Sequence, residues 1–170
     1  MITRKEIKHY LAQEPAFDDI TCSLKATAKQ PAGIVRETKK VVAMARKFNE
    51  EVVRPHALSM DRTMQADPDY LPWDLVKKAN EWGFFTMWIP KLFGGHGYSI
   101  PTLAYFMEET GSVCLGLSNL ICVHYLAIST IFGSWNPRMI NRLCRLVAEG
   151  ERTGRPCLIS TAITEPGAGT

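Results

Sequence analysis

The feature that most constrains the fold is a long internal stretch without charge. Between Glu109 and Arg138 the chain carries no Asp, Glu, Lys or Arg residue. That length exceeds the roughly 20 apolar residues that cross a bilayer, so a membrane span has to be considered. However, polar residues such as Ser118, Asn119 and His124 interrupt the stretch, and no cluster of Lys or Arg anchors one end. We therefore expect helices buried inside protein and no membrane span.

Glycines divide this stretch into two successive helices. Gly111 and Gly116 predict a break, and the second half, residues 117–132, is apolar nearly all round. A helix of that kind has to be covered on every side. Two interpretations stay open. The first is a core helix in which a buried partner satisfies His124. The second is a helix that lines a pocket for an apolar chain, with three side chains on one face at four-residue steps: Ser118, Cys122 and Leu126.

Further helices flank this stretch. Apolar residues recur at three- and four-residue steps from residue 31 to about residue 54. A second helix begins near Pro72 and ends at Gly83, which suits a left-handed C-cap. Asn136 and a first-turn proline begin the last helix, which we expect to end at Gly150. The order of elements, several helices and then one strand, predicts a mainly α fold.

Two glycine-rich segments bear on function. The loop Phe93-Gly94-Gly95-His96-Gly97 lacks the Lys-Ser/Thr pair of a P-loop, so we interpret it as a structural turn between helices. The last residues run as a short β-branched strand into a turn that contains two glycines. The hydroxyls of Thr164 and Thr170 stand on either side of that turn. This arrangement suits a phosphate-bearing or polar heteroaromatic ligand held by main-chain N–H groups.

The composition excludes several classes of function. A net charge of +3, with Lys and Arg scattered along the chain, provides no basic tract for nucleic acid. The five cysteines are odd in number and contain no C-x-x-C pair. We therefore expect no zinc site and no disulfide framework, but reduced thiols in a cytoplasmic protein. No apolar segment follows Met1, so we expect no secretory signal, and residues 1–30 are interpreted as a leader.

The terminal segment resembles a known signature. Residues 164–170 read Thr-Glu-Pro-Gly-Ala-Gly-Thr, which resembles the Thr-Glu-Pro-x-x-Gly-Ser signature of the flavin-dependent acyl-CoA dehydrogenases. Further matches lie upstream at the spacing of that family: Pro90 with the loop at residues 93–97, the Glu108-Glu109 pair, His124, and Ala148-Glu149-Gly150-Glu151. Together they cover residues 34–170. Several motifs in the right order are more specific than one.

The resemblance implies an N-terminal helical domain, a middle β-domain and a C-terminal helical bundle. The chain would then comprise a leader at 1–30, the helical N-terminal domain at 31–156, and the first strand and Gly-rich turn of an incomplete β-domain at 157–170. Members of the family oxidise acyl-CoA thioesters between the α and β carbons, with hydride transfer to FAD. Their catalytic base comes from the C-terminal domain, so no catalytic residue is assigned in this chain.

The same resemblance implies where ligands bind. Cofactor-binding residues are expected in the terminal segment: Thr161, Ile163, Thr164, Gly169 and Thr170. The first three would lie against the flavin ring and the last two near the FAD pyrophosphate. Substrate-binding residues are expected at the acyl pocket and the thioester: Ser118, Cys122, Leu126 and Thr170. Two departures matter, because Thr170 replaces the usual Ser and Thr161 stands where an aromatic or small residue is common.

The implied partners are an acyl-CoA substrate and an electron-transfer flavoprotein or similar acceptor. We also expect a homo-oligomer or a complementary subunit and, for these residues alone, weak FAD binding without turnover. The Glu108-Glu109 pair is interpreted as tied to nearby Arg residues and Glu165 as part of the turn, not as bases. Two alternatives stay open: a non-catalytic helical interaction module or split subunit that needs a partner chain, and an acyl-CoA oxidase or flavin monooxygenase on the same scaffold.

Overall fold

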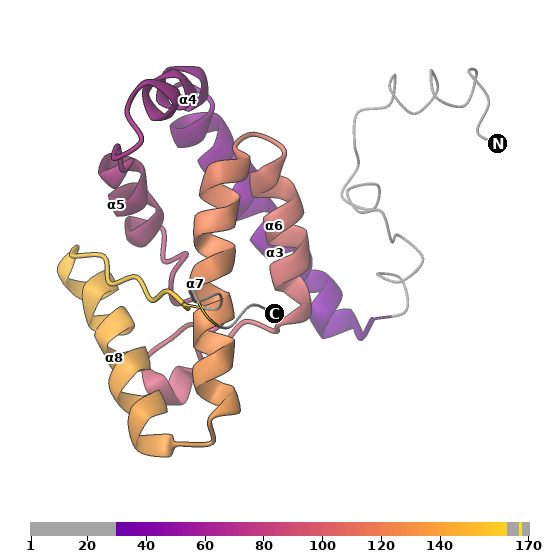
Figure 1. The fold of residues 1–170 in the computed structure, drawn as a ribbon. Helices are drawn as coiled ribbons and strands as arrows, with labels where there is room; N and C mark the ends of the chain where they lie inside the picture. Colours follow the sequence, from indigo (N-terminus) through magenta and orange to yellow (C-terminus); the bar gives the residue numbers. More distant parts are fainter. Residues whose placement is uncertain (1–29, 163–166, 168–170) are drawn as a thin grey trace.

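The computed structural model of the chain describes residues 30–162 and Gly167. Almost all of the predicted leader and most of the predicted cofactor-binding turn therefore lie outside the described residues. The described part contains six α-helices (Figure 1): α3 (Ala32–Phe48), α4 (Ala57–Ala66), α5 (Trp73–Glu81), α6 (Pro101–Gly111), α7 (Leu115–Gly133) and α8 (Pro137–Thr153). A π-helical segment, η2 (Asn49–Val53), extends α3, and a 3-10 turn, η3 (Lys91–Phe93), precedes the Gly-rich loop. The prediction of a mainly α fold is confirmed.

The predicted strand at residues 157–170 is described only in part. Residues 155–162 follow α8 without pairing as a β-strand, and no described residue belongs to a sheet. A strand needs a neighbour to satisfy its row of N–H and C=O groups. The strand and the division into domains therefore stay predictions.

Helix α7 lies in the middle of the fold (Figure 1). Helix α6 packs against it and against α3, while α8 packs against it and against α5. The buried face of α7 places Ile121 and Tyr125 in a core that also contains the fully buried Phe48, Phe84 and Phe106. The Phe84 ring meets each of the two other phenylalanine rings edge to face, with centroids 4.8 Å apart. Such pairs add about 0.5–1.5 kcal/mol to the area that they bury.

The expectation that α7 is covered on every side is wrong for the described part of the chain. Leu115 and Leu126 are 76% and 45% exposed, and Cys122 is exposed as well. By length and composition α7 is able to cross a bilayer, and 39% of its most apolar window is buried. This is weak evidence for a span, because the core helix of a water-soluble domain passes the same test. The absence of a span stays a prediction, and the open side of α7 faces a cavity.

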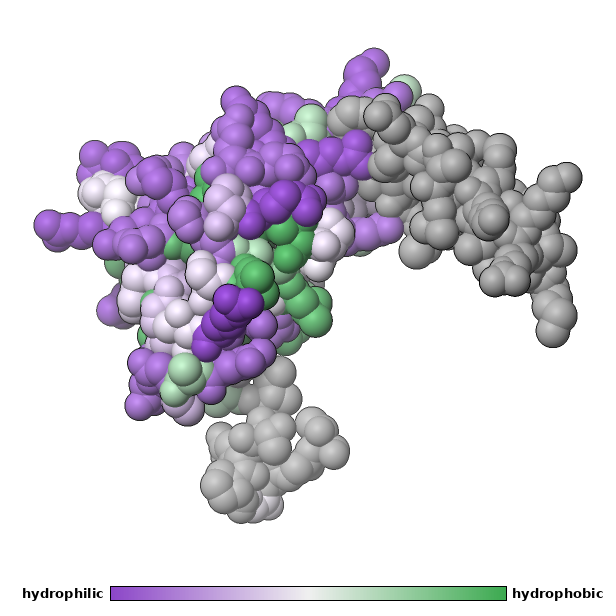
Figure 2. Space-filling view, turned by 90° about the horizontal axis from the view of Figure 1, so that it is seen from above, coloured by the Kyte–Doolittle hydropathy of each residue, from purple (hydrophilic) through white to green (hydrophobic). Residues whose placement is uncertain are grey.

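Apolar side chains also reach the surface elsewhere. Figure 2 shows hydrophilic residues over most of one face, with a smaller hydrophobic area among them. Ile100, at the start of α6, is 65% exposed, and Trp135, between α7 and α8, is 89% exposed. Single exposed apolar residues are ordinary, whereas groups of them mark places where something else binds. The two groups that matter for function are described below.

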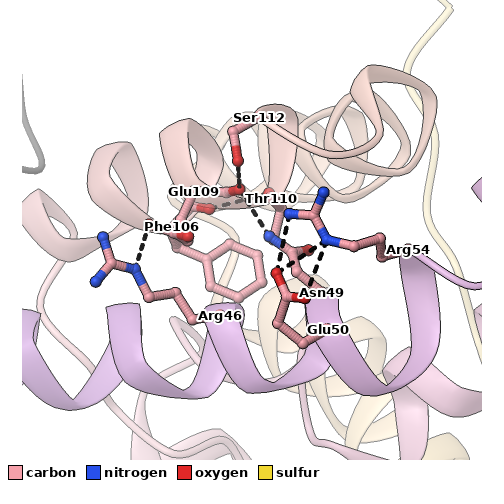
Figure 3. A network of polar contacts seen from close by, with 8 residues as sticks. All are labelled: Arg46, Asn49, Glu50, Arg54, Phe106, Glu109, Thr110 and Ser112. Carbon is pink, nitrogen blue, oxygen red and sulfur yellow. Dashed lines mark hydrogen bonds and ion pairs between the residues drawn. The ribbon is translucent and has the colours of Figure 1, made fainter. Parts of the chain in front are cut away.

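A polar cluster joins α3 to the end of α6 (Figure 3). The Arg46 guanidinium lies 3.1 Å from the Glu109 carboxylate, and the Asn49 amide donates a 2.8 Å hydrogen bond to the Glu109 carbonyl. The Ser112 hydroxyl donates to the same carbonyl at 2.7 Å. The prediction that this glutamate is tied to a nearby Arg is confirmed for Glu109.

Most predicted helix ends agree with the structure, and one does not. Asn136 caps α8, because its side chain accepts a hydrogen bond from the Met139 N–H at 3.1 Å. The expected end of that helix at Gly150 is wrong, since α8 continues to Thr153 and ends at Gly154, whose φ is 69°. Gly150 lies inside α8, and its lack of a side chain leaves room for the chain that returns after the helix. A Cβ there would lie 2.7 Å from the carbonyl oxygen of residue 155, on the returning segment. Helix α4 was not predicted at all.

Candidate functional site

A cavity of about 760 Å³ lies between the Gly-rich loop, α6 and the open side of α7. Its wall is mostly apolar and includes six large side chains: Trp88, Ile100, Leu103, Leu126, Ile128 and Phe132. Smaller polar groups, among them Ser99, Cys122 and Ser129, interrupt it. The Ser129 hydroxyl is already satisfied, because it donates to the Leu126 carbonyl at 2.7 Å. No carboxylate of the described residues lines the cavity, which suits the binding of an apolar chain better than acid–base chemistry.

The Gly-rich loop forms one wall because it folds back onto the segment before it. The N–H groups of Gly97 and Tyr98 donate to the carbonyls of Ile89 and Met87 at 2.9 and 2.8 Å. Gly95 lies so close to this segment that a Cβ would stand 2.1 Å from the Ile89 carbonyl oxygen. The loop is therefore a structural turn, as predicted, and it directs residues 98–100 toward α7.

The carboxylate of Glu151 fastens this loop to α8. One carboxylate oxygen lies 2.9 Å from Nε2 of His96, and the other accepts a hydrogen bond from the Thr86 hydroxyl. The contact joins the Gly-rich loop, the turn after α5 and the last turn of α8. Glu151 is thus occupied in holding the fold and does not point into the cavity.

The aromatic rings of Trp88 and Tyr125 line the cavity, whereas their polar atoms are hydrogen-bonded to other groups of the protein. Trp88 and Tyr125 meet at right angles with ring centroids 4.8 Å apart. The indole N–H of Trp88 donates to the Thr102 hydroxyl at 2.9 Å, and the Tyr125 hydroxyl donates to the Phe84 carbonyl at 2.6 Å. Burial raises the pKa of Tyr125 well above its ordinary value. The phenol is therefore a neutral structural group and not an acid or base for a bound ligand.

The three residues predicted to share a pocket face do not all reach the cavity. Cys122 and Leu126 line it, but Ser118 is buried in the contact between α6 and α7. The Ser118 hydroxyl donates to the Met107 carbonyl at 3.1 Å and lies 3.3 Å from the Thr110 hydroxyl. Four residues exceed one helical turn of 3.6, so each step rotates the side chain by about 40° around the axis. The substrate-binding role of these residues stays a prediction.

Several lining residues had no signal in the sequence. Tyr98, Ile100 and Leu103 come from the end of the Gly-rich loop and the start of α6, and Phe132 comes from the last turn of α7. Their apolar character was equally consistent with the core. Only the fold of the Gly-rich loop, which brings these residues together, distinguishes them from core residues. The sequence predicted that loop correctly as a turn but did not connect it to a cavity.

His124 joins α7 to the terminal segment. Its Nε2 lies 3.1 Å from the Phe85 carbonyl, and its Nδ1 lies 3.1 Å from the N–H of Ile159. The carbonyl only accepts and the N–H only donates, so the ring must be neutral with its proton on Nε2. Burial lowers the pKa of His124 to about 4. The interpretation of His124 as a core residue satisfied by a buried partner is confirmed, and its role is to hold residues 155–162 against the helices.

The terminal segment leads to the predicted cofactor site. The hydroxyl oxygen of Thr161 is buried and has no hydrogen-bond partner among the described residues. Buried polar atoms are nearly always paired, so this hydroxyl fits a polar ligand atom beside it. The other predicted cofactor-binding residues, Ile163, Thr164, Gly169 and Thr170, lie outside the described residues. The cofactor-binding role of all five residues, Thr161 included, stays a prediction.

The chain is similar to known proteins over most of its length. A family model described as "Acyl-CoA dehydrogenase, N-terminal domain" matches residues 36–151. The chain is 28% identical over 149 residues to a probable medium-chain specific acyl-CoA dehydrogenase of Caenorhabditis briggsae, covering 87% of this chain and 34% of that protein.

Two bacterial proteins match the chain with similar identity and coverage. A short-chain specific acyl-CoA dehydrogenase of Clostridium acetobutylicum is 28% identical over 138 residues, which is 81% of this chain and 34% of that protein. A cyclohex-1-ene-1-carbonyl-CoA dehydrogenase of Geobacter metallireducens is 30% identical over 137 residues, again 81% of this chain and 34% of that protein. The chain thus spans about a third of the length of these relatives.

Proposed function

Because the chain belongs to the acyl-CoA dehydrogenase family and carries its N-terminal domain, we propose that it forms the first third of a flavin-dependent oxidoreductase. The proposed substrate is an acyl-CoA thioester, oxidised between its α and β carbons. The described residues contribute binding surface and shape, while the catalytic base is supplied outside this chain. The observation that carries the proposal is the apolar cavity beside α7.

The cavity is suited to the hydrocarbon part of such a substrate. Each methylene that leaves water for an apolar surface stabilises the complex by about 0.8 kcal/mol. Leu126 and Ile128 of α7 line the cavity together with Ile100 and Leu103, so an apolar chain bound there leaves water. The absence of a carboxylate from the lining means that the chain meets no charged group of the described residues.

Two described glutamates, Glu109 of α6 and Glu151 of α8, are engaged in structural contacts. Glu109 pairs with Arg46, and Glu151 holds His96 and Thr86. Neither carboxylate lines the cavity. This supports a base that comes from another part of the protein or from a partner chain.

The proposed cofactor is FAD, which supplies the acceptor for a hydride when it is bound. Within the described residues, the unpartnered hydroxyl of Thr161 is the group that fits it. His124 holds the preceding backbone through Ile159 and thereby positions Thr161 beside the helical domain. Ile163, Thr164, Gly169 and Thr170 complete the proposed site.

The remaining proposals concern the surroundings of the enzyme. We propose an electron-transfer flavoprotein or similar acceptor, and assembly as a homo-oligomer or with a complementary subunit. The open side of α7, with Leu115 and Leu126 exposed, supports an arrangement in which further protein covers it. Cys114, Cys122, Cys144 and Cys157 are free thiols, which supports a reducing, cytoplasmic location.

A chimera tests the proposal. The matching first third of the medium-chain relative from Caenorhabditis briggsae is replaced by this chain, and the purified protein is assayed for flavin absorbance and for octanoyl-CoA oxidation with a dye acceptor. We expect a yellow, active chimera, while the 170-residue chain alone shows no turnover. A folded chimera that is colourless and inactive would contradict the proposal and favour a non-catalytic interaction module.

Two variants of the chimera test the cavity itself. Leu126→Arg places a charge in the apolar wall, and burying an unpaired charge is costly, so we expect KM for octanoyl-CoA to rise at least about tenfold. Leu58→Arg, on the 63% exposed Leu58 of α4, is the matched control and should change KM less than about twofold. Equal effects of the two variants would argue against this cavity as the acyl site.

A further inference from the structure

The outward face of α8 is basic and is not neutralised by the described residues. Arg138, Arg142 and Arg145 follow one another at steps of four and three, which places them on one side of the helix. The opposite side packs into the core with Ile140 and Cys144. Within residues 30–162 no carboxylate pairs with these three arginines, and the only hydrogen bond of their side chains runs from Arg145 to the Asn141 amide oxygen at 2.8 Å.

An exposed tryptophan stands at the beginning of this face. Trp135 connects α7 to α8, is 89% exposed, and has a φ of 51°. L-residues with bulky side chains rarely adopt this left-handed conformation, so the chain holds the indole outward at a conformational cost. Met139 and Leu146, 39% and 49% exposed, lie beside the arginines on α8. Trp135, Met139 and Leu146 thus lie among three arginines that no carboxylate of residues 30–162 neutralises.

The same face borders a hollow. A depression of about 700 Å³ lies between α8 and the turn after η3, with Phe93 and Gly94 on one side and Arg142, Arg145 and Leu146 on the other. Its wall also includes two carboxylates, of which Glu149 is held by Arg152 at 2.5 Å and Glu151 is held by His96 and Thr86. The hollow offers room for a side chain of a partner beside Arg142 and Arg145.

We propose that this α8 face, defined by Trp135, Arg138, Met139, Arg142, Arg145 and Leu146, docks an acidic polypeptide that carries apolar side chains. Arginine, tryptophan and methionine are the residue types enriched in protein interfaces, and tryptophan and arginine dominate their binding energy. An anionic membrane fits less well. The apolar stripe of α8 is buried in the core and cannot enter lipid. The inference does not depend on the flavin.

A binding assay on the 170-residue chain tests the proposal. The probe is a fluorescein-labelled peptide of repeated Glu-Glu-Leu units, and its counterpart with Lys in place of Glu is the charge control. We expect binding of the acidic peptide alone, weakening steeply with added salt. The double variant R142E/R145E should weaken it at least about tenfold. W135A should weaken it about fivefold or more while the salt dependence stays.

The matched control is K77E/K78E, which makes the same change of charge at two exposed lysines of α5 and should alter binding less than about twofold. Thermal unfolding of each variant shows that it is folded. Equal binding by the wild type and R142E/R145E overturns the proposal, as does equal loss in both double variants. Binding to phosphatidylserine vesicles without binding to the acidic peptide overturns it as well, in favour of a lipid surface.

Discussion

Lowering the pH should loosen the terminal segment through a single buried imidazole. His124 is 1% exposed and stays neutral between the Phe85 carbonyl and the Ile159 N–H. Protonation would direct a second ring N–H at the N–H of Ile159. The pKa of His124 in the folded protein is about 4, because burial lowers it from 6.5. The unfolded chain therefore takes up the proton first as the pH falls, and the folded state loses stability.

The size of this effect follows from the two pKa values. The stability contributed by the neutral ring is fully present above pH 6.5 and is lost as the pH falls from 6.5 to about 4. The whole interval corresponds to about 3 kcal/mol, and the part above pH 5 to about 2 kcal/mol. A loss of that size is a large fraction of the stability of a small domain.

The variant His124→Gln isolates this contribution. A glutamine amide is able to donate to the Phe85 carbonyl and to accept from the Ile159 N–H, but it does not titrate. We expect the free energy of unfolding, measured with urea at pH 5 and pH 7, to differ between these pH values by about 2 kcal/mol less than in the wild type. His56→Gln, at an exposed position, should leave the wild-type difference unchanged. If both variants keep the full pH dependence, the account of His124 is refuted.

Three further predictions concern the loop, the core and the cavity. Gly95→Ala should destabilise the fold by more than about 3 kcal/mol in urea denaturation, because the added Cβ meets the Ile89 carbonyl at 2.1 Å, whereas Gly133→Ala, with open space around it, should be neutral or slightly stabilising. Asn80→Ala should cost about 1–3 kcal/mol in the same measurement, since it removes the 3.0 Å hydrogen bond from the Asn80 amide to a carbonyl of α8. Cys122→Phe should fill part of the cavity and lower kcat/KM of the active chimera for octanoyl-CoA about tenfold or more, with less effect on butanoyl-CoA.

Features decided by a few neighbouring residues were predictable from the sequence. Asn136 followed by proline marked the start of α8, and Gly83 marked the end of α5 with its φ of 76°. Gly111, the last residue of α6, and Gly116, the second residue of α7, flank the break between the two helices. For Asn136-Pro137 and Gly83 the local backbone requirement alone selects the residue type. The same holds for the Gly-rich loop, whose residue types indicated a turn.

Features decided by distant residues were not predictable. Gly150 looked like a helix end, but it lies inside α8 because the returning backbone needs the space. The all-round apolar pattern of α7 indicated complete burial, but a sequence does not say which neighbour is present. Ser118 and Cys122 stand one step apart on the helix, and only the positions of α6 and the loop decide that one is buried and the other lines the cavity.

The central claim, that the open side of α7 walls an acyl site, is tested most directly by the reactivity of Cys122. This thiol is exposed on the cavity wall, whereas Cys144 is buried and serves as an internal reference. In the active chimera, the rate at which iodoacetamide alkylates Cys122, measured by mass spectrometry, should fall with increasing octanoyl-CoA. The rate should stay unchanged with CoA alone. An alkylation rate that is the same with octanoyl-CoA, with CoA and without ligand would contradict the account.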